Sequence, residues 1–184
     1  MSKTIGNVVN PYDLVGKYGT DALRYYLLAK INPYDDSDFT IEKFEEVYNG
    51  ELANGLGNLV SRVASLAQSL PDFKYIKPKN HTNTISKDIA NEIQDYRFDE
   101  ALNLIWNSIR AVDLYLSTEK PWRLDDSKPN DQHKKVEVVS SCITLLSDIA
   151  DNLKPFLPDT AQKIEAQFKG PKIKSSEPLF PRLK

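Results

Sequence analysis

The sequence contains a single cysteine, Cys142, which excludes an internal disulfide and a metal site built from cysteine. Its two histidines lie far apart in polar stretches, so no metal site is indicated. No apolar run approaches membrane-spanning length and no signal peptide is visible, so we expect a cytoplasmic protein without membrane contact. An excess of positive charge is also lacking, because the formal net charge is −2. Any nucleic-acid site must therefore be a local patch.

What the sequence has in abundance is apolar residues at helical spacing, as in residues 51–70, 98–116 and 136–153. This pattern predicts an all-α fold, an antiparallel bundle of about five helices. We divide the chain into an N-terminal arm of loop and helix, residues 1–39, and the helical bundle with a C-terminal tail, residues 40–184.

Turn and cap residues set the expected limits of these helices. The pair Asn49-Gly50 predicts a break before the first bundle helix, and Thr84 is the expected N-cap of a later one. The charged stretch 123–135 predicts an exposed loop, with helix resuming at Val136. We expect the C-terminal tail to pack back on the start of the chain.

The first bundle helix, residues 51–70, carries a second stripe beside its apolar face. Asn58 and Arg62 are spaced four apart, and Asn54 extends the same line by one turn. Asn and Arg are side chains that read base edges and phosphates through paired hydrogen bonds. The alternative is that these polar residues only face water.

A second candidate binding motif, Lys120-Pro121-Trp122, lies where a later helical pattern ends. Lys120 precedes proline and is disfavoured from helical geometry, while Pro121 restricts the backbone before Trp122. A rigidly placed indole is a stacking platform for an unpaired base. The alternative is a tryptophan that plugs the end of the bundle, whereas Trp106, within an apolar stripe, is predicted to be core.

The connector after the first bundle helix, residues 71–83, contains two prolines and carries Lys74, Lys77 and Lys79. It is either a plain connector or a basic rim near an RNA backbone.

Four segments resemble one family. Met1-Ser2-Lys3-Thr4, followed by residues 5–9, resembles the KMSKS signature of class I aminoacyl-tRNA synthetases with its first lysine missing. Residues 11–28 resemble the methionyl-tRNA synthetase family in particular. The Asn-x-x-x-Arg of residues 58–62 and the Pro-Trp of residues 121–122 match two further motifs of that family.

The resemblance implies an ATP site at the N-terminal loop. Lys3 would be the catalytic lysine that stabilises the transition state of adenylate formation, with Ser2 and Thr4 as further ATP-binding residues and Mg present in the full-length enzyme. The nucleotide-binding sheet that such a loop serves is missing from these residues. The resemblance implies that this chain is part of a methionine–tRNA ligase. We therefore expect the chain alone to bind no cofactor and to be inactive.

The resemblance also implies that Asn58, Arg62 and Trp122 recognise the CAU anticodon of methionine tRNA, with Asn54 as a further candidate. The family often has asparagine where this chain has Asp113. A carboxylate would repel phosphates, so Asp113 must either face the core or pair with a basic side chain.

Two other functions stay open. The chain could be a protein-interaction or scaffold module without an RNA role, which its acidic balance favours. It could also be half of a split synthetase that a separate catalytic chain completes. That hypothesis predicts an exposed apolar patch at Val8, Val9, Leu14 and Val15.

Overall fold

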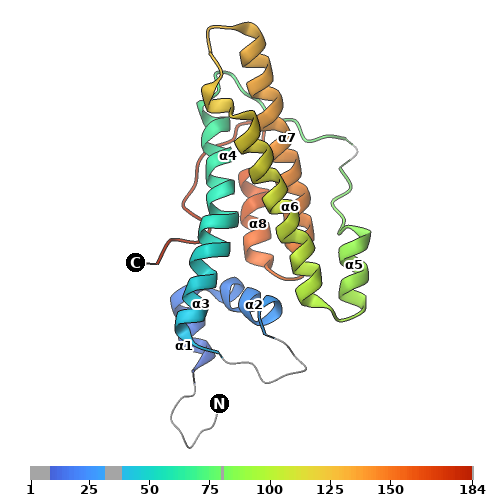
Figure 1. Cartoon of the computed structure of the whole chain (residues 1–184). Coiled ribbons are helices and arrows are strands. Elements are labelled where there is room, and N and C mark those ends of the chain that lie inside the picture. Colours follow the sequence, from blue (N-terminus) through green and yellow to red (C-terminus); the bar gives the residue numbers. More distant parts are fainter. Residues whose placement is uncertain (1–8, 32–38, 80, 184) are drawn as a thin grey trace, which may run out of the picture.

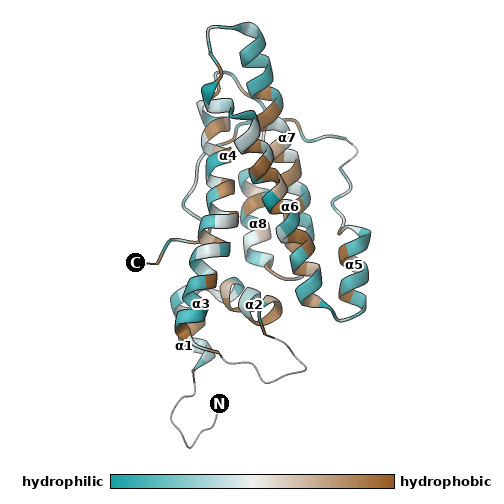
Figure 2. Cartoon of the chain, viewed as in Figure 1, coloured by the Kyte–Doolittle hydropathy of each residue, from teal (hydrophilic) through white to brown (hydrophobic). Residues whose placement is uncertain are grey.

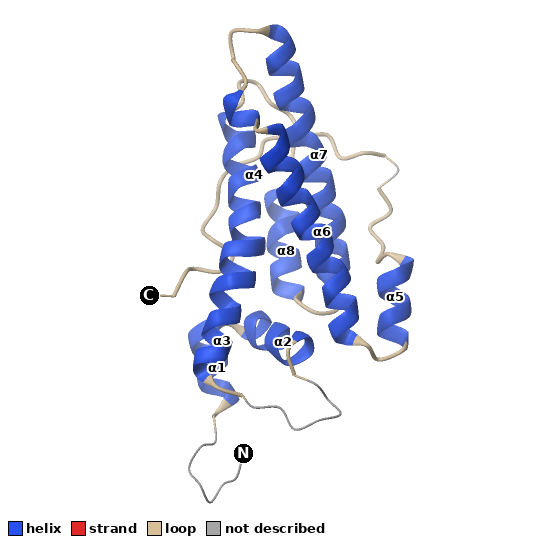
Figure 3. Ribbon diagram, viewed as in Figure 1, coloured by secondary structure: helices blue, strands red, loops and turns tan. Residues whose placement is uncertain are grey.

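The computed structural model describes residues 9–31, 39–79 and 81–183, and over these residues it consists of helices and loops without strands (Figures 1 and 3). The prediction of an all-α fold, with a helical arm leading into an antiparallel bundle, is confirmed. The helices in chain order are α1 (Pro11–Tyr18), α2 (Thr20–Ala29), α3 (Ile41–Val47), η1 (Tyr48–Gly57), α4 (Asn58–Ser69), α5 (Lys87–Gln94), α6 (Phe98–Glu119), η2 (Pro121–Arg123), α7 (Pro129–Leu153) and α8 (Pro158–Gln167).

The helices α3, η1 and α4 form one continuous rod, which runs up one side of the molecule (Figure 1). The predicted break at Asn49-Gly50 is wrong. The chain changes winding there instead: η1 is a π-helix, and the Asn58 N–H donates to the carbonyl of Ala53, five residues back. Residues at both junctions keep right-handed helical backbone angles, so the rod does not bend sharply. Short π-helical stretches are frequent at functional sites.

The long helices α6 and α7 lie side by side and pack with α4 and α8 around the core (Figures 1 and 2). Cys142 is fully buried there and Trp106 nearly so, which confirms both as core residues. Burial raises the pKa of the Cys142 thiol to about 11, so this cysteine stays neutral at physiological pH. The short helix α5 packs against α6 at the side of the bundle.

Two predicted helix starts are wrong. Helix α7 begins at Pro129 rather than Val136, because a proline suits the first helical position and Asp131 favours the positive end of the helix dipole. The charged stretch that we predicted as loop is thus partly the exposed first turns of α7. Helix α5 is capped by Ser86 rather than Thr84, since the Ser86 hydroxyl accepts from the Ile89 N–H at 3.5 Å.

The connector between α4 and α5 is fastened to the bundle by a buried histidine. The His81 ring lies between two carboxylates of α7, with Nδ1 3.0 Å from Asp148 and Nε2 2.8 Å from Asp151. Burial alone would raise the pKa of Asp151, but hydrogen bonds from Lys154 and His81 outweigh it and lower that pKa, so the carboxylate stays charged. No sequence pattern indicated this burial, because polar residues flank His81 on both sides.

The arm docks on the corner between α7 and α8. Arg24 of α2 donates from Nε to the Phe156 carbonyl at 2.6 Å and from Nη2 to the Pro155 carbonyl at 2.8 Å. The buried carboxylate of Asp21 accepts from the Thr160 N–H at 2.7 Å, at the start of α8. These bonds occupy backbone groups that a helix end and a proline corner leave without partners.

The exposed apolar patch that the split-synthetase hypothesis predicts does not form from the described residues of the arm. Leu14 is buried in the core, and Val9 and Val15 are only partly accessible and pack against it. Val8 lies outside the described residues.

The C-terminal tail runs back along the rod (Figure 1). The Ser175 N–H donates to Gln68 Oε1 at 2.6 Å, the Phe180 ring meets Tyr48 edge-on at 5.9 Å, and the Leu183 N–H donates to Asn49 Oδ1 at 2.9 Å. The tail therefore covers one side of α4 and η1.

Replacement of Asp21 with alanine should lower the free energy of unfolding by about 1–3 kcal/mol, because it leaves the buried Thr160 N–H without an acceptor. Urea denaturation followed by circular dichroism measures the change. Glu46→Ala, on the exposed side of α3, is the control and should have little effect. An equal stability of the two variants would show that the arm is not held by this bond.

Candidate nucleic-acid interface

The open edge of α4 brings a basic, an acidic and an aromatic side chain together. Arg62 places Nη1 2.6 Å from Asp113 Oδ1 of α6, and its guanidinium carbon lies 5.6 Å from the centre of the Trp122 ring. The ion pair and the cation–π contact fix the guanidinium from two directions. About half of Trp122 is still exposed, so the ring keeps a surface on which another planar group can stack.

The end of α6 determines where Trp122 lies. Lys120 takes a left-handed conformation with φ of 45°, which ends the helix. Pro121 is buried, and the following turn is closed by the Arg123 N–H, which donates to the Lys120 carbonyl at 2.8 Å. The proline and the turn hold the backbone of Trp122, so the predicted rigid placement of this ring agrees with its surroundings. The alternative of a buried plug is wrong, because the ring is half exposed.

Asn58 lies one helical turn before Arg62 on the same side of α4. It lines a surface hollow of about 210 Å³ between the rod and the tail. Apolar groups form part of this hollow, and Asn58, Ser61 and Arg182 add polar side chains with no hydrogen-bond partner within the part of the chain that the structure describes. The lining residues are Ala53, Gly57, Asn58, Ser61, Pro178, Phe180 and Arg182.

Sequence reasoning missed Ser61 and Arg182 as members of this site. Ser61 lies between the two motif residues Asn58 and Arg62, but a serine on a helix carries no signal of its own. Arg182 comes from the far end of the chain, and only the folding of the tail onto α4 brings it near Asn58.

Asp113 pairs with Arg62, which decides between the two positions that the sequence left open. Both side chains are partly exposed, so the pair faces the surface rather than the core. Because Asp113 contacts one edge of the guanidinium, it orients Arg62 while the remaining N–H groups stay available for another acceptor.

The other predicted site residues are placed as follows. Asn54, within η1, is exposed and does not line the hollow beside Asn58. Ser2, Lys3 and Thr4 lie outside the described residues. Across residues 9–31, 39–79 and 81–183, no three His, Cys, Asp or Glu side chains are grouped to hold a metal ion. In that same part of the chain, no helix has the length and apolar character needed to cross a membrane.

Taken together, the interface offers a stacking surface, an oriented guanidinium and an amide along one exposed edge. An amide both donates and accepts, and a guanidinium donates in a fixed planar fork. These groups match the face and the hydrogen-bonding edge of an unpaired base better than they match a phosphate backbone.

Two family profiles match the chain. The profile of class I tRNA synthetases (M) matches residues 1–64, and that of the anticodon-binding domain of tRNA ligases matches residues 79–184. The fold and these two matches therefore define the anticodon-binding region of a class I tRNA ligase.

The relatives narrow this class to one family. The chain is 32% identical to the methionine–tRNA ligase of Clostridium acetobutylicum and 30% identical to that of Fusobacterium nucleatum, and each alignment covers all of this chain but only 32% and 34% of the relative. The chain belongs to the methionyl-tRNA synthetase family and corresponds to the portion from the KMSKS-like loop through the helical bundle. It spans about a third of the length of these relatives.

Solved structures show the same fold. Mycobacterium tuberculosis methionyl-tRNA synthetase bound by methionyl-adenylate superimposes with a TM-score of 0.86 at 23% identity, over 98% of this chain and 41% of that one. The free form of the same enzyme gives a TM-score of 0.83 at 22% identity, over 96% of this chain and 41% of that one.

Replacement of Asp113 with alanine should change the free energy of unfolding by less than about 1 kcal/mol, because partly exposed ion pairs contribute little to stability. Ile109→Ala, a buried position on the same helix, should cost about 2–5 kcal/mol and is the matched comparison. Chemical denaturation of both variants makes the measurement. A loss above about 2 kcal/mol for Asp113→Ala would mean that the pair holds α4 to α6 rather than orienting Arg62.

Proposed function

We propose that this chain recognises the CAU anticodon of methionine tRNA. The observation that carries the proposal is Arg62, held between Asp113 and the half-exposed Trp122 ring on the same edge of α4 as Asn58. The match to the anticodon-binding domain of tRNA ligases and the methionine–tRNA ligase relatives support it.

Recognition requires that bases of the anticodon loop leave their stack. One unstacked base lies on the exposed face of Trp122, where stacking is worth roughly 1–3 kcal/mol. Arg62 donates to a base edge or a phosphate, and Asn58 pairs with a base edge through its amide. The Asp113 carboxylate orients Arg62 and disfavours phosphates that approach from its own side.

The catalytic part of the proposal concerns the whole protein. We infer that the complete enzyme is a cytoplasmic ATP-dependent methionine–tRNA ligase that also uses Mg, and that Ser2, Lys3 and Thr4 contact its ATP. A mobile lysine such as Lys3 can follow negative charge as it develops on the pyrophosphate leaving group. The described residues contain no strand, so we propose that these 184 residues form no adenylate by themselves and that a catalytic part is supplied in the same chain or by a separate one.

The anticodon proposal predicts selective binding to a short RNA hairpin with a CAU loop, compared with the same hairpin carrying one changed anticodon base. Trp122→Ala should weaken binding to the CAU hairpin about tenfold, because it removes the stacking surface. Fluorescence anisotropy of labelled hairpins at two salt concentrations gives both affinities.

Tyr12→Ala removes a more exposed aromatic ring from the arm and is the control, with no expected effect on hairpin binding. Equal binding of the two hairpins to the unaltered chain would refute anticodon recognition by this bundle. The scaffold hypothesis would then be favoured.

The catalytic inference predicts that these 184 residues show no methionine-dependent exchange between ATP and pyrophosphate. The full-length methionine–tRNA ligase of Clostridium acetobutylicum is the positive control. Exchange above background that disappears in Lys3→Ala would contradict the inference.

A further inference from the structure

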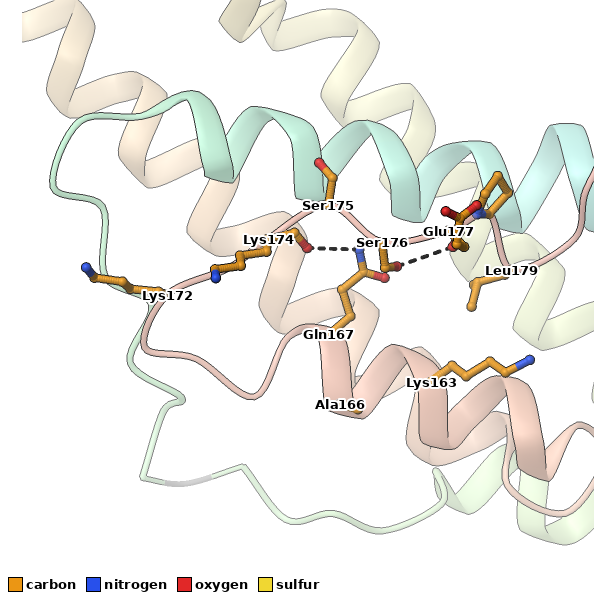
Figure 4. Close-up of a pocket in the computed structure, with 10 residues that line it drawn as sticks. Lys163, Ala166, Gln167, Lys172, Lys174, Ser175, Ser176, Glu177 and Leu179 are labelled. Atoms are coloured by element: carbon orange, nitrogen blue, oxygen red, sulfur yellow. Dashed lines mark hydrogen bonds between the residues drawn. The ribbon is translucent and has the colours of Figure 1, made fainter.

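A cluster of lysines lies on the side of the rod next to the interface. Two adjoining surface grooves, of about 560 and 610 Å³, meet at Lys172 and Lys174 of the tail, which line both. Lys163 of α8 lines the first groove and Lys74 of the connector lines the second. Figure 4 shows Lys172 and Lys174 at one end of the first groove and Lys163 toward the other end.

Chain segments far apart in the sequence hold these lysines together. The Tyr75 N–H donates to the Pro171 carbonyl at 2.9 Å, which fixes the chain beside Lys74 against the chain beside Lys172. The ring of Tyr75 is buried, so this crossing belongs to the core rather than to a free loop. This backbone contact therefore places Lys74 and Lys172 on neighbouring segments.

The tail presents its two lysines on one side. Ile173 between them is buried, and in an extended backbone alternate residues face opposite ways, so Lys172 and Lys174 both face outward. Gln167 Nε2 donates to the Lys174 carbonyl at 3.4 Å (Figure 4). The Ser175 N–H donates to Gln68 on α4. These bonds fix the tail on both sides.

The lysines of the cluster are not neutralised by nearby carboxylates. Among the described residues, no Asp or Glu oxygen lies within 4.0 Å of the ammonium groups of Lys74, Lys163, Lys172 or Lys174, although Lys17, Lys30, Lys128, Lys134, Lys135 and Lys154 have such partners. Asp72 and Glu177 also line the grooves, which leaves an excess of two positive charges there. In a chain with a formal net charge of −2, this is a local basic patch.

The patch lies close to the nucleic-acid interface along α4. Gln68, which holds the tail beside Lys174, is roughly 9 Å beyond Arg62 along the helix axis, at about 1.5 Å per residue. At about 100° per residue Gln68 also lies about 120° round the helix from Arg62. A hairpin with its loop at Arg62 and Trp122 therefore brings phosphates near the grooves when its stem crosses α4 toward the tail. The exposed hydroxyls of Ser175 and Ser176 add donors of the kind that phosphate oxygens accept.

We propose that Lys74, Lys172 and Lys174, with Lys163 at the far end of the groove, form a second RNA-binding surface that holds the phosphate backbone of the hairpin stem. The proposal rests on the proposed function for the choice of RNA as the anion. It differs from that function because backbone contacts carry affinity without sequence, whereas base contacts carry specificity.

The test is the salt dependence of hairpin binding by the full chain. The double variant Lys172→Gln/Lys174→Gln should lower the slope of log affinity against log salt by about two, roughly one for each lost phosphate contact, between about 50 and 200 mM salt. The loss should be the same for the CAU hairpin and the hairpin with one changed base.

Lys43→Gln/Lys87→Gln is the matched control, since it removes the same charge from exposed positions on α3 and α5. The control should leave the slope unchanged. If the groove variant has the same salt slope as the unaltered chain, the proposal is overturned. An acidic protein segment would then be favoured as the occupant of the grooves. A loss confined to the CAU hairpin would overturn it as well, because it would indicate base contacts.

The outcomes separate this surface from the anticodon site. If the unaltered chain binds both hairpins equally while the groove variant still loses slope, the backbone surface stands and anticodon recognition fails. If the CAU preference is present and the groove variant keeps its slope, anticodon recognition stands and the backbone surface fails.

Discussion

The rod from Ile41 to Ser69 is the element on which the rest of the structure depends. Its apolar residues are buried along its whole length, and different parts of the rod pack against different elements. Its lower part packs Phe44 and Tyr48 against the rings of the arm, and its upper part packs against α7. The tail covers a further side of it. Asn58 and Arg62 lie on an edge of α4 that stays partly exposed between the tail and α6.

Electrostatics then decide what the open edge can do. A chain with slightly more acidic than basic residues cannot attract nucleic acid over its whole surface, so positive charge has to be placed locally. Arg62 is oriented by one carboxylate and one ring, which favours a specific geometry over a diffuse charge. The lysines of the grooves have no such orienting partners among the described residues, which suits sequence-independent contact with a backbone.

Much of this arrangement could be predicted from the sequence. Helical periodicity indicated the bundle, and apolar stripes identified Cys142 and Trp106 as core. The spacing of Asn58 and Arg62, with Pro121 before Trp122, singled out the side chains of the open edge; the structure brings Arg62 and Trp122 together, although whether they read an anticodon stays a prediction.

What the sequence could not predict depends on contacts between distant segments. The burial of His81 requires two carboxylates of α7, and the position of Arg182 requires the tail to lie along α4. The continuous rod was missed because Asn49-Gly50 is a strong local break signal. Tertiary packing of the flanking residues overrides that signal, and the π-helical winding keeps the rod intact.

The rod also sets a fixed separation between the arm and the interface. Arg62 lies roughly 30 Å from Ile41 along the axis, at about 1.5 Å per residue. At the lower end of the rod, Glu51 fixes η1 against α2. It accepts from the Tyr25 hydroxyl and pairs with Lys30 at 2.7 Å. Tyr25 in turn stacks on Trp106 of α6 at 4.2 Å. Because α2, η1 and α6 meet at this point, the arm cannot shift relative to the interface without breaking a buried contact. The protein thus holds helix α2 and its candidate base-reading edge at a constant distance.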